Sequence, residues 1–302
     1  MYKDDIISEV FKPYLDDMKM KKYSPKTIRH YDYILMTFYS FLTAKGITRL
    51  QDITTEDIEA YHLYLKDKKF STGSCENLMG GVKTLFKWLD ATNRIFVNPC
   101  TDVIMPKRII KLLPVPTEEE VKRLLLQPDI STRTGVRDRA IMEVVYGCGL
   151  RRAEVTGLTV FDPNLNQGTL RVRGKGNKER VVPLGKKAVT WIKKYLKHAR
   201  PELIKDRIDE NSLWLSIQKG RQLGDFGIRQ QVREYTIKAK IKTPMNLHSL
   251  RRACATHMLA NGAHPIEIQL LLGHANLKTL SHYLSVTITD IMKMHKQSKP
   301  GR

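Results

Sequence analysis

The sequence predicts a two-domain fold: an all-helical N-terminal domain, then a mostly helical α+β domain with a small antiparallel sheet. Three observations support this class. The 302 residues exceed what one hydrophobic core usually serves. Apolar residues recur at helical spacing through the first third of the chain. Two short β-type runs flank a glycine-rich segment in the second half.

The first third of the chain has clear helix-start signals. Ser24 before Pro25 reads as an N-cap with proline at the first helical position, where a missing N–H costs no hydrogen bond. One helical face follows, made of Ile28, Tyr31, Leu35, Phe38 and Leu42. Thr54 opens a second helix, and a third carries Val82, Leu85, Phe86 and Leu89. We expect a compact four-helix domain over residues 1–106.

A proline-flanked basic stretch separates the two domains. Residues 107–116 follow Pro106 and end at Pro116, and the basic stretch between these prolines has no Gly, Asn, Asp or Ser, so it predicts an extended linker. Thr117 followed by Glu120 is a capping box that opens a new helix. The second domain is therefore expected over residues 117–302.

The second domain predicts one hairpin among helices. The runs Thr169–Arg173 and Arg180–Leu184 are typical of strands, and Gly174-Lys175-Gly176-Asn177 forms a basic, glycine-rich tip between them. The remaining segments predict helices, over residues 186–198, 227–240, 250–261 and 265–272.

Composition points to a polyanion as the partner. The chain has 52 Lys and Arg against 31 Asp and Glu, a formal net charge of +21. Such an excess is typical of nucleic-acid binders, whose affinity falls with salt. No apolar run is long enough to span a membrane, and the acidic start MYKDDIISEV is unlike a signal peptide. We therefore expect a cytoplasmic, nucleoid-associated protein.

The four widely spaced cysteines predict free thiols rather than a zinc site or disulfides.

Five short strings in the second domain combine basic residues, histidines and one tyrosine. They are Gly149–Glu154, Gly174–Lys178, His248–Arg251, Leu272–His274 and Tyr283. In order and spacing they resemble the catalytic domain of tyrosine recombinases, the phage integrase family, and most of all its Xer-type bacterial members. The tyrosine follows His274 by nine residues, as in that family. The resemblance extends to the N-terminal helices, which look like the family's SAM-like core-binding domain.

The residue types suit phosphodiester chemistry. The planar guanidiniums of Arg151 and Arg251 can fork onto non-bridging phosphate oxygens and stay charged. His248 and His274 can hydrogen-bond the same phosphate, and one of them can take a proton from a phenol. Glu154 is expected to pair with an arginine or base of the site, with a surface ion pair as the alternative.

Tyr283 is the expected nucleophile. A phenol with its usual pKa of about 10 attacks poorly, so it needs a cationic surround. Lys175 on the hairpin tip can protonate the departing 5′-oxygen. The resemblance implies a 3′-phosphotyrosyl intermediate that conserves bond energy, so no cofactor, metal or ATP is expected.

The resemblance also implies the partners. These are double-stranded DNA with inverted-repeat half-sites, and a tetramer on two duplexes formed by this chain alone or with a paralogous recombinase; accessory DNA-bending proteins can join. Lys83 and Lys87 are candidate phosphate contacts, with a solvated helix face as the alternative. Arg252 stands where relatives often have His, and Leu284-Ser285 where many have Thr-His. These departures lie outside the six catalytic positions, and they weaken the interpretation as a housekeeping resolvase of chromosome dimers rather than a recombinase of a mobile element.

The segment after Tyr283 predicts a short helix over residues 286–294. Thr287 or Thr289 can cap it, and Ile288, Ile291 and Met292 share one side. So short a helix must dock its apolar side. The resemblance suggests docking on a neighbouring protomer, passed head to tail around a ring; docking on its own domain is the alternative.

Three other functions remain open at this point. A type IB-like topoisomerase would use the same chemistry without joining two sites. A catalytically silent DNA-binding protein would share the fold, but we expect it to have lost catalytic residues. A basic RNA-binding module is the third, without the aromatic strand motif that supports one.

Overall fold

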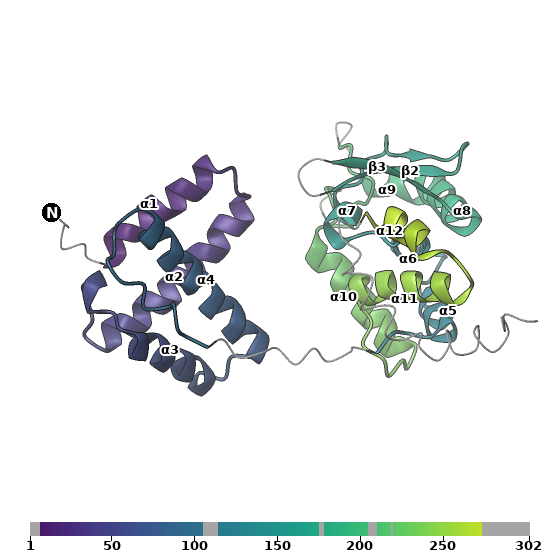
Figure 1. The fold of residues 1–302 in the computed structure, drawn as a ribbon. Coiled ribbons are helices and arrows are strands. Elements are labelled where there is room, and N and C mark those ends of the chain that lie inside the picture. Colours follow the sequence, from purple (N-terminus) through teal and green to yellow (C-terminus); the bar gives the residue numbers. More distant parts are fainter. Residues whose placement is uncertain (1–6, 105–113, 175–177, 205–209, 219, 274–302) are drawn as a thin grey trace, which may run out of the picture. The chain divides into compact units, whose positions relative to one another are not determined.

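The computed structural model describes residues 7–104, 114–174, 178–204, 210–218 and 220–273. The chain divides into two compact units, Met1–Lys111 and Leu112–Arg302, and each is described by itself (Figure 1). The predicted fold class is confirmed: the first unit is helical, and the second is mostly helical with a small antiparallel sheet.

The N-terminal unit packs its helices around one core. The helices are α1 (Ile7–Met20), α2 (Pro25–Ala44), α3 (Thr55–Asp67) and α4 (Thr72–Ala91), with a 3₁₀ turn at Leu50–Asp52. Two predicted caps are present: the Ser24 side chain accepts from the Thr27 amide, and Thr54 forms a capping box with Asp57. The predicted apolar stripes face the core: most of their residues are buried, and Ile28 and Tyr31 are partly buried against it. Edge-to-face rings of Phe38, Tyr61 and Phe86 lie among them.

The C-terminal unit is built around α6 (Arg133–Cys148). This helix contacts α5 (Glu118–Leu125), α8 (Lys186–Lys194) and α11 (Leu247–Ala260). Its buried residues occupy every side, as expected of a helix enclosed in a core. The other helices are α7 (Arg152–Thr156), α9 (Arg200–Ile204), α10 (Asp225–Lys238) and α12 (Pro265–Leu272). A π-helical turn at Tyr195–Ala199 joins α8 to α9.

The predicted hairpin is present and carries a third strand. Strand β2 (Thr169–Arg173) pairs antiparallel with β3 (Glu179–Pro183), Val172 opposite Arg180, and with β1 (Pro163–Asn164) on its other edge. β1 was not predicted, because a two-residue strand has no periodicity to read. The tip residues 175–177 lie outside the described residues.

Helix α11 also begins earlier than predicted, at Leu247 rather than Leu250. The cause is local: the Asn246 side chain accepts from the Ser249 amide, and the Ser249 hydroxyl receives the Asn246 N–H, which completes a capping box. His248 therefore lies in the first turn of α11, on the same helix as Arg251.

The end of the predicted linker is held by α11. Arg252 Nη2 donates to the Pro114 carbonyl (2.9 Å), and His257 Nε2 lies 2.9 Å from the Pro116 carbonyl oxygen. Residues 107–113 lie outside the described residues, so the linker bounds of 107–116 stay a prediction.

Three expectations from composition concern described residues. The four cysteines are free and buried, as predicted. Among the described helices, none is both long and apolar enough to cross a membrane. In the same part of the chain, no group of three or more His, Cys, Asp or Glu side chains is placed to hold a metal ion.

Candidate active site

The turn between α6 and α7 presents Arg151. Gly149 ends α6 with a left-handed backbone (φ 58°), and Leu150 is fully buried. A side chain at Gly149 would also meet Leu272 Cδ2 at 2.5 Å, so both backbone and space call for glycine. Arg151 then caps α7 with extended backbone, and its side chain is 41% exposed.

Glu154 lies on the first turn of α7 and is buried at the centre of the site. Its Oε2 accepts the Arg151 backbone N–H (2.7 Å), and its Oε1 accepts Arg151 Nη1 (2.9 Å). Arg180, on β3, forks onto both carboxylate oxygens at 2.7 and 3.0 Å. Arg251 Nη1 is 3.9 Å from Oε2. One carboxylate thus faces three guanidiniums, which leaves the cluster strongly positive.

The same three arginines bind the last carbonyl groups of α12. Arg180 Nε donates to Leu271 O (3.2 Å), Arg251 Nη2 to Leu272 O (2.8 Å) and Arg151 Nη2 to Gly273 O (2.7 Å). A helix leaves its last carbonyls without helical partners and carries partial negative charge at that end. The arginines donate hydrogen bonds to these carbonyls, and their positive charge compensates the partial negative charge of the helix end. They also fix the chain at Gly273, the residue before His274.

Arg251 is the buried member of the cluster. Its side chain is 3% exposed, and Nη1 also donates to the carbonyl of Gly149 at the end of α6. A buried guanidinium needs several acceptors to offset its lost hydration, and here two helix ends supply them. Arg251 therefore joins α6, α11 and α12 at the site.

The pKa values follow from these surroundings. Burial alone would raise the pKa of Glu154, but the hydrogen bonds from Arg180 and Arg151 outweigh burial and hold it below its usual value. Desolvation, then the positive charges of Arg252 and Arg251, lower the pKa of His248. His248 is therefore neutral at neutral pH and can accept a proton.

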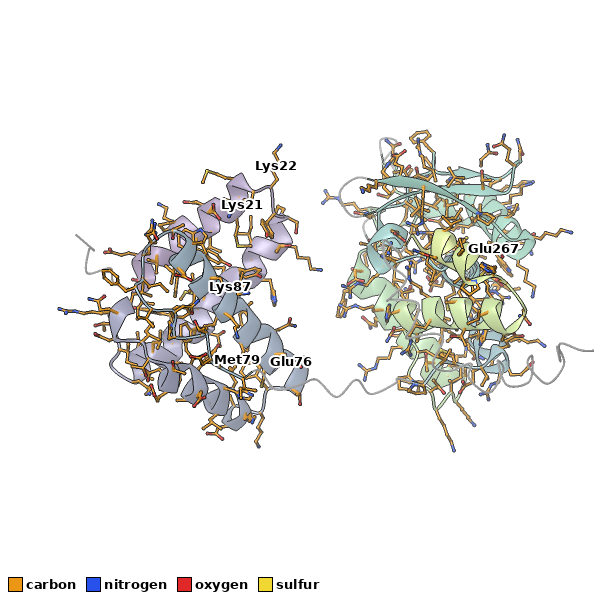
Figure 2. The ribbon with its side chains drawn as sticks, viewed as in Figure 1. Lys21, Lys22, Glu76, Met79, Lys87 and Glu267 are labelled. Atoms are coloured by element: carbon orange, nitrogen blue, oxygen red, sulfur yellow. The ribbon has the colours of Figure 1, made fainter. Side chains whose placement is uncertain are left out.

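The structure places only some of the predicted site residues. Arg151, Glu154 and Arg251 are in direct contact, and His248 is one helical turn from Arg251 on α11. Lys175, His274 and Tyr283 lie outside the described residues. In the N-terminal unit, Lys87 is exposed on α4 (Figure 2). Lys83, four residues earlier, is partly buried and donates to the Val103 carbonyl (3.4 Å).

Arg180 is the site residue that the sequence reasoning missed. It was interpreted only as the start of a strand. The available signal was its register: Arg180 and Val182 are two residues apart, so they share the face of β3 that packs on the core. An arginine on an inward face needs a carboxylate partner.

The fold and this cluster define a class of protein: a chain of two compact units, the second of which gathers three arginines around one carboxylate in an arrangement suited to a phosphodiester ligand. The "Phage integrase family" model matches residues 115–289, and the "Phage integrase, N-terminal SAM-like domain" model matches residues 11–93.

Individual relatives agree over almost the whole chain. The tyrosine recombinase XerC 2 of Ralstonia nicotianae is 34% identical, covering 98% of this chain and 87% of the relative. The tyrosine recombinase XerD of Shewanella oneidensis is 33% identical, covering 95% of each. The crystal structure of the XerA recombinase is 26% identical with a TM-score of 0.54, covering 98% of this chain and all of that one. The XerH recombinase bound to a palindromic difH substrate has the same fold (TM-score 0.74, 21% identity, covering 96% of this chain and 82% of that one).

The chain belongs to the phage integrase family, the tyrosine recombinases, which cleave and rejoin DNA strands. These findings support site-specific recombination and do not favour a topoisomerase or a catalytically silent DNA-binding protein.

Proposed function

We propose that this chain recombines DNA at specific sites by transient covalent attachment through Tyr283. The observation that carries the proposal is the cluster of Arg151, Arg180 and Arg251 around Glu154 at the end of α12. It collects positive charge beside the point where Gly273 leads to His274. A phosphate that gains negative charge as it is attacked is the ligand that such a cluster stabilises.

We assign one or more residues to each step of the strand exchange. The phenol oxygen of Tyr283 bonds to the scissile phosphorus, and His248 or His274 accepts the phenol proton. The bond from phosphorus to the 5′-oxygen breaks, and Lys175 donates a proton to that oxygen. Arg151 and Arg251 neutralise the non-bridging oxygens meanwhile. A 5′-hydroxyl of the partner duplex reverses these steps and joins the strands, so no external energy source is needed.

Assembly on DNA belongs to the same proposal. Lambda integrase, which has this fold, has been solved as a dimer bound to a core site and as a tetramer bound to a Holliday junction. We propose inverted-repeat half-sites for this chain and a tetramer on two duplexes, with Lys87 and Lys83 near the phosphates and the protein associated with the nucleoid. The segment 286–294, outside the described residues, is the proposed contact between protomers. Deleting residues 287–302 should spare half-site binding and abolish synapsis in a native gel; normal synapsis would refute the contact.

The nucleophile is tested with Tyr283→Phe on nicked half-site DNA. We expect normal binding but no covalent complex in a denaturing gel, because the ring keeps its shape and loses the attacking oxygen. Arg151→Lys is the companion variant. It should cleave at least about 10²-fold more slowly, since an ammonium cannot replace a forked pair of hydrogen bonds. An adduct in Tyr283→Phe would assign the nucleophile elsewhere.

A further inference from the structure

Arg180 belongs to the arginine cluster but takes part in none of the bond changes above, and it contacts both α7 and α12. It forks onto Glu154 of α7 and donates to Leu271 of α12, and its own strand leads out of the hairpin that carries Lys175. Figure 1 shows β3, α7 and α12 in the same half of the C-terminal unit.

The guanidinium of Arg180 is closely enclosed. Its side chain is 18% exposed. A Cβ added to Gly273 would lie 3.0 Å from Arg180 Nε and 3.1 Å from its Cδ and Cζ. Gly174, at the start of the hairpin tip, would place a Cβ 3.7 Å from Glu154 Oε1 and 3.9 Å from Arg180 Nη1. A Cβ at Gly174 would thus be in ordinary van der Waals contact with the ion pair, whereas a Cβ at Gly273 would crowd the Arg180 side chain.

The hydrogen bonds on Glu154 show what Arg180 does to Arg151. A carboxylate offers about four acceptor positions. Arg180 fills two of them, and Arg151 fills the others with its backbone N–H and with Nη1. Arg151 is thereby kept from a two-nitrogen pair with Glu154, and its Nη2 lies on Gly273 O instead. Without Arg180, two acceptor positions open and Glu154 can draw the Arg151 guanidinium towards itself.

We propose that Arg180 is a positioning residue for DNA cleavage: it saturates Glu154 and so presents the Arg151 guanidinium to the scissile phosphate. Arg180 acts through Arg151 and does not touch the phosphate itself. The proposal rests on the assignment of Arg151 as a phosphate ligand.

The test uses full-length Arg180→Gln with Arg139→Gln as its matched control. Arg139 is also a mostly buried arginine (13% exposed) that pairs with a glutamate, Glu143, and donates to a backbone carbonyl, that of Leu125. Its hydrogen-bond partners lie on α5 and α6, and its guanidinium also lies over the Trp191 ring of α8 (5.0 Å to the centroid). Both variants lose a comparable ion pair, but only Arg180→Gln disturbs the site.

The measurement is the single-turnover rate of covalent complex formation at saturating nicked half-site DNA. We expect Arg180→Gln to be slower by about 10²-fold, the loss typical of one preorganised donor, with half-site affinity little changed. Arg139→Gln should cleave at the wild-type rate per folded molecule. Arg180→Lys should recover part of the rate, because it restores the charge opposite Glu154 without the fork.

A second substrate separates positioning from misfolding. A methylphosphonate at the scissile position lacks one charged non-bridging oxygen and so depends less on Arg151. The deficit of Arg180→Gln should shrink on it, whereas a misfolded variant would be equally poor on both substrates. Arg151→Gln combined with Arg180→Gln should be no slower than Arg151→Gln alone.

The outcomes distinguish this proposal from the site assignment. Additive losses, wild-type cleavage by Arg180→Gln, or an unchanged deficit on the methylphosphonate would overturn the role of Arg180. Normal cleavage by Arg151→Gln would instead overturn Arg151 as the phosphate ligand.

Discussion

Glu154 is the residue on which the charge balance of the site depends. It is 3% exposed and takes hydrogen bonds from Arg151 and Arg180 while Arg251 lies within 3.9 Å. A buried carboxylate is tolerated here because the guanidiniums compensate its lost hydration. The reverse also holds: the guanidiniums need the carboxylate to pack together in the free protein.

Glu154→Gln should therefore destabilise the protein even though its shape is kept. Removing one partner of a buried ion pair costs about 3–5 kcal/mol, because it leaves uncompensated charge. Folding lowers the pKa of Glu154, so its carboxylate stabilises the folded protein at pH values above the pKa that Glu154 has in the unfolded chain. This stabilisation is lost as the pH falls through the pKa of Glu154 in the folded protein. Urea unfolding against pH should show a smaller acid-induced loss in the variant. An unchanged free energy of unfolding at neutral pH would contradict this account.

His248 should titrate below its usual pKa of 6.5, because desolvation and then Arg252 and Arg251 disfavour its charged form. Carbon-edited NMR of the DNA-free protein measures this directly, with His248→Asn to assign the signal. Arg252→Gln removes one positive neighbour and should raise the midpoint, while Arg139→Gln should leave it in place. A midpoint at or above 6.5 in the wild type would contradict the lowering of the His248 pKa by desolvation and the two arginines.

At the scale of elements, the sequence predicted what is locally encoded. Helix starts at Ser24, Thr54 and Thr117 were found because a cap needs only neighbouring residues. The hairpin was found from its strand-forming runs and its glycine-rich tip. The partners of Arg180 were not, since Glu154 and Leu271 lie 26 and 91 positions away in the chain. The common attachment of three arginines to the end of α12 is equally a product of tertiary packing.

Helix α11 serves the site at one end and the end of the linker at the other. His248 and Arg251 lie in its first half, and His257 holds Pro116 in its second. The Pro116 carbonyl can only accept, so His257 Nε2 donates to it and Nδ1 accepts from the Tyr146 hydroxyl (2.9 Å). This arrangement requires the neutral imidazole.

His257 should therefore lower the free energy of unfolding at acidic pH. Burial lowers its pKa, and Glu118 and the Pro116 carbonyl only partly oppose burial. As the pH falls below 6.5, His257 is protonated in the unfolded chain but stays neutral in the folded chain. The free energy of unfolding therefore decreases with falling pH until the folded pKa is reached. His257→Gln keeps one donor and one acceptor but cannot titrate. Between about pH 7 and about pH 5.5, the free energy of unfolding measured with urea should change less with pH in the variant. An identical slope would refute the requirement for a neutral His257 imidazole.

At the scale of the whole molecule, the two units have separate cores and unequal charge. The core of the first unit ends at Val103, and that of the second begins at Val121. Of the net charge of +21, Leu112–Arg302 carries +17, from 34 Lys and Arg and 17 Asp and Glu. Met1–Lys111 carries +4, from 18 and 14. Electrostatic attraction to DNA is therefore concentrated in the unit that holds the candidate active site.

A fragment of residues 112–302 should fold by itself and keep most of the salt dependence of DNA binding. The dependence of affinity on salt counts the phosphates that the protein neutralises, and each contributes about 0.9 to the logarithmic slope on duplex DNA. Fluorescence anisotropy with one half-site across a salt series gives this slope for the full chain and the fragment. Lys83→Gln/Lys87→Gln in the full chain measures what α4 adds. If the fragment binds with less than half the slope of the full chain, phosphate contacts are concentrated in the helical N-terminal unit despite its small net charge. In that case local surfaces such as the exposed side of α4, and not the overall charge, would set the attraction to DNA.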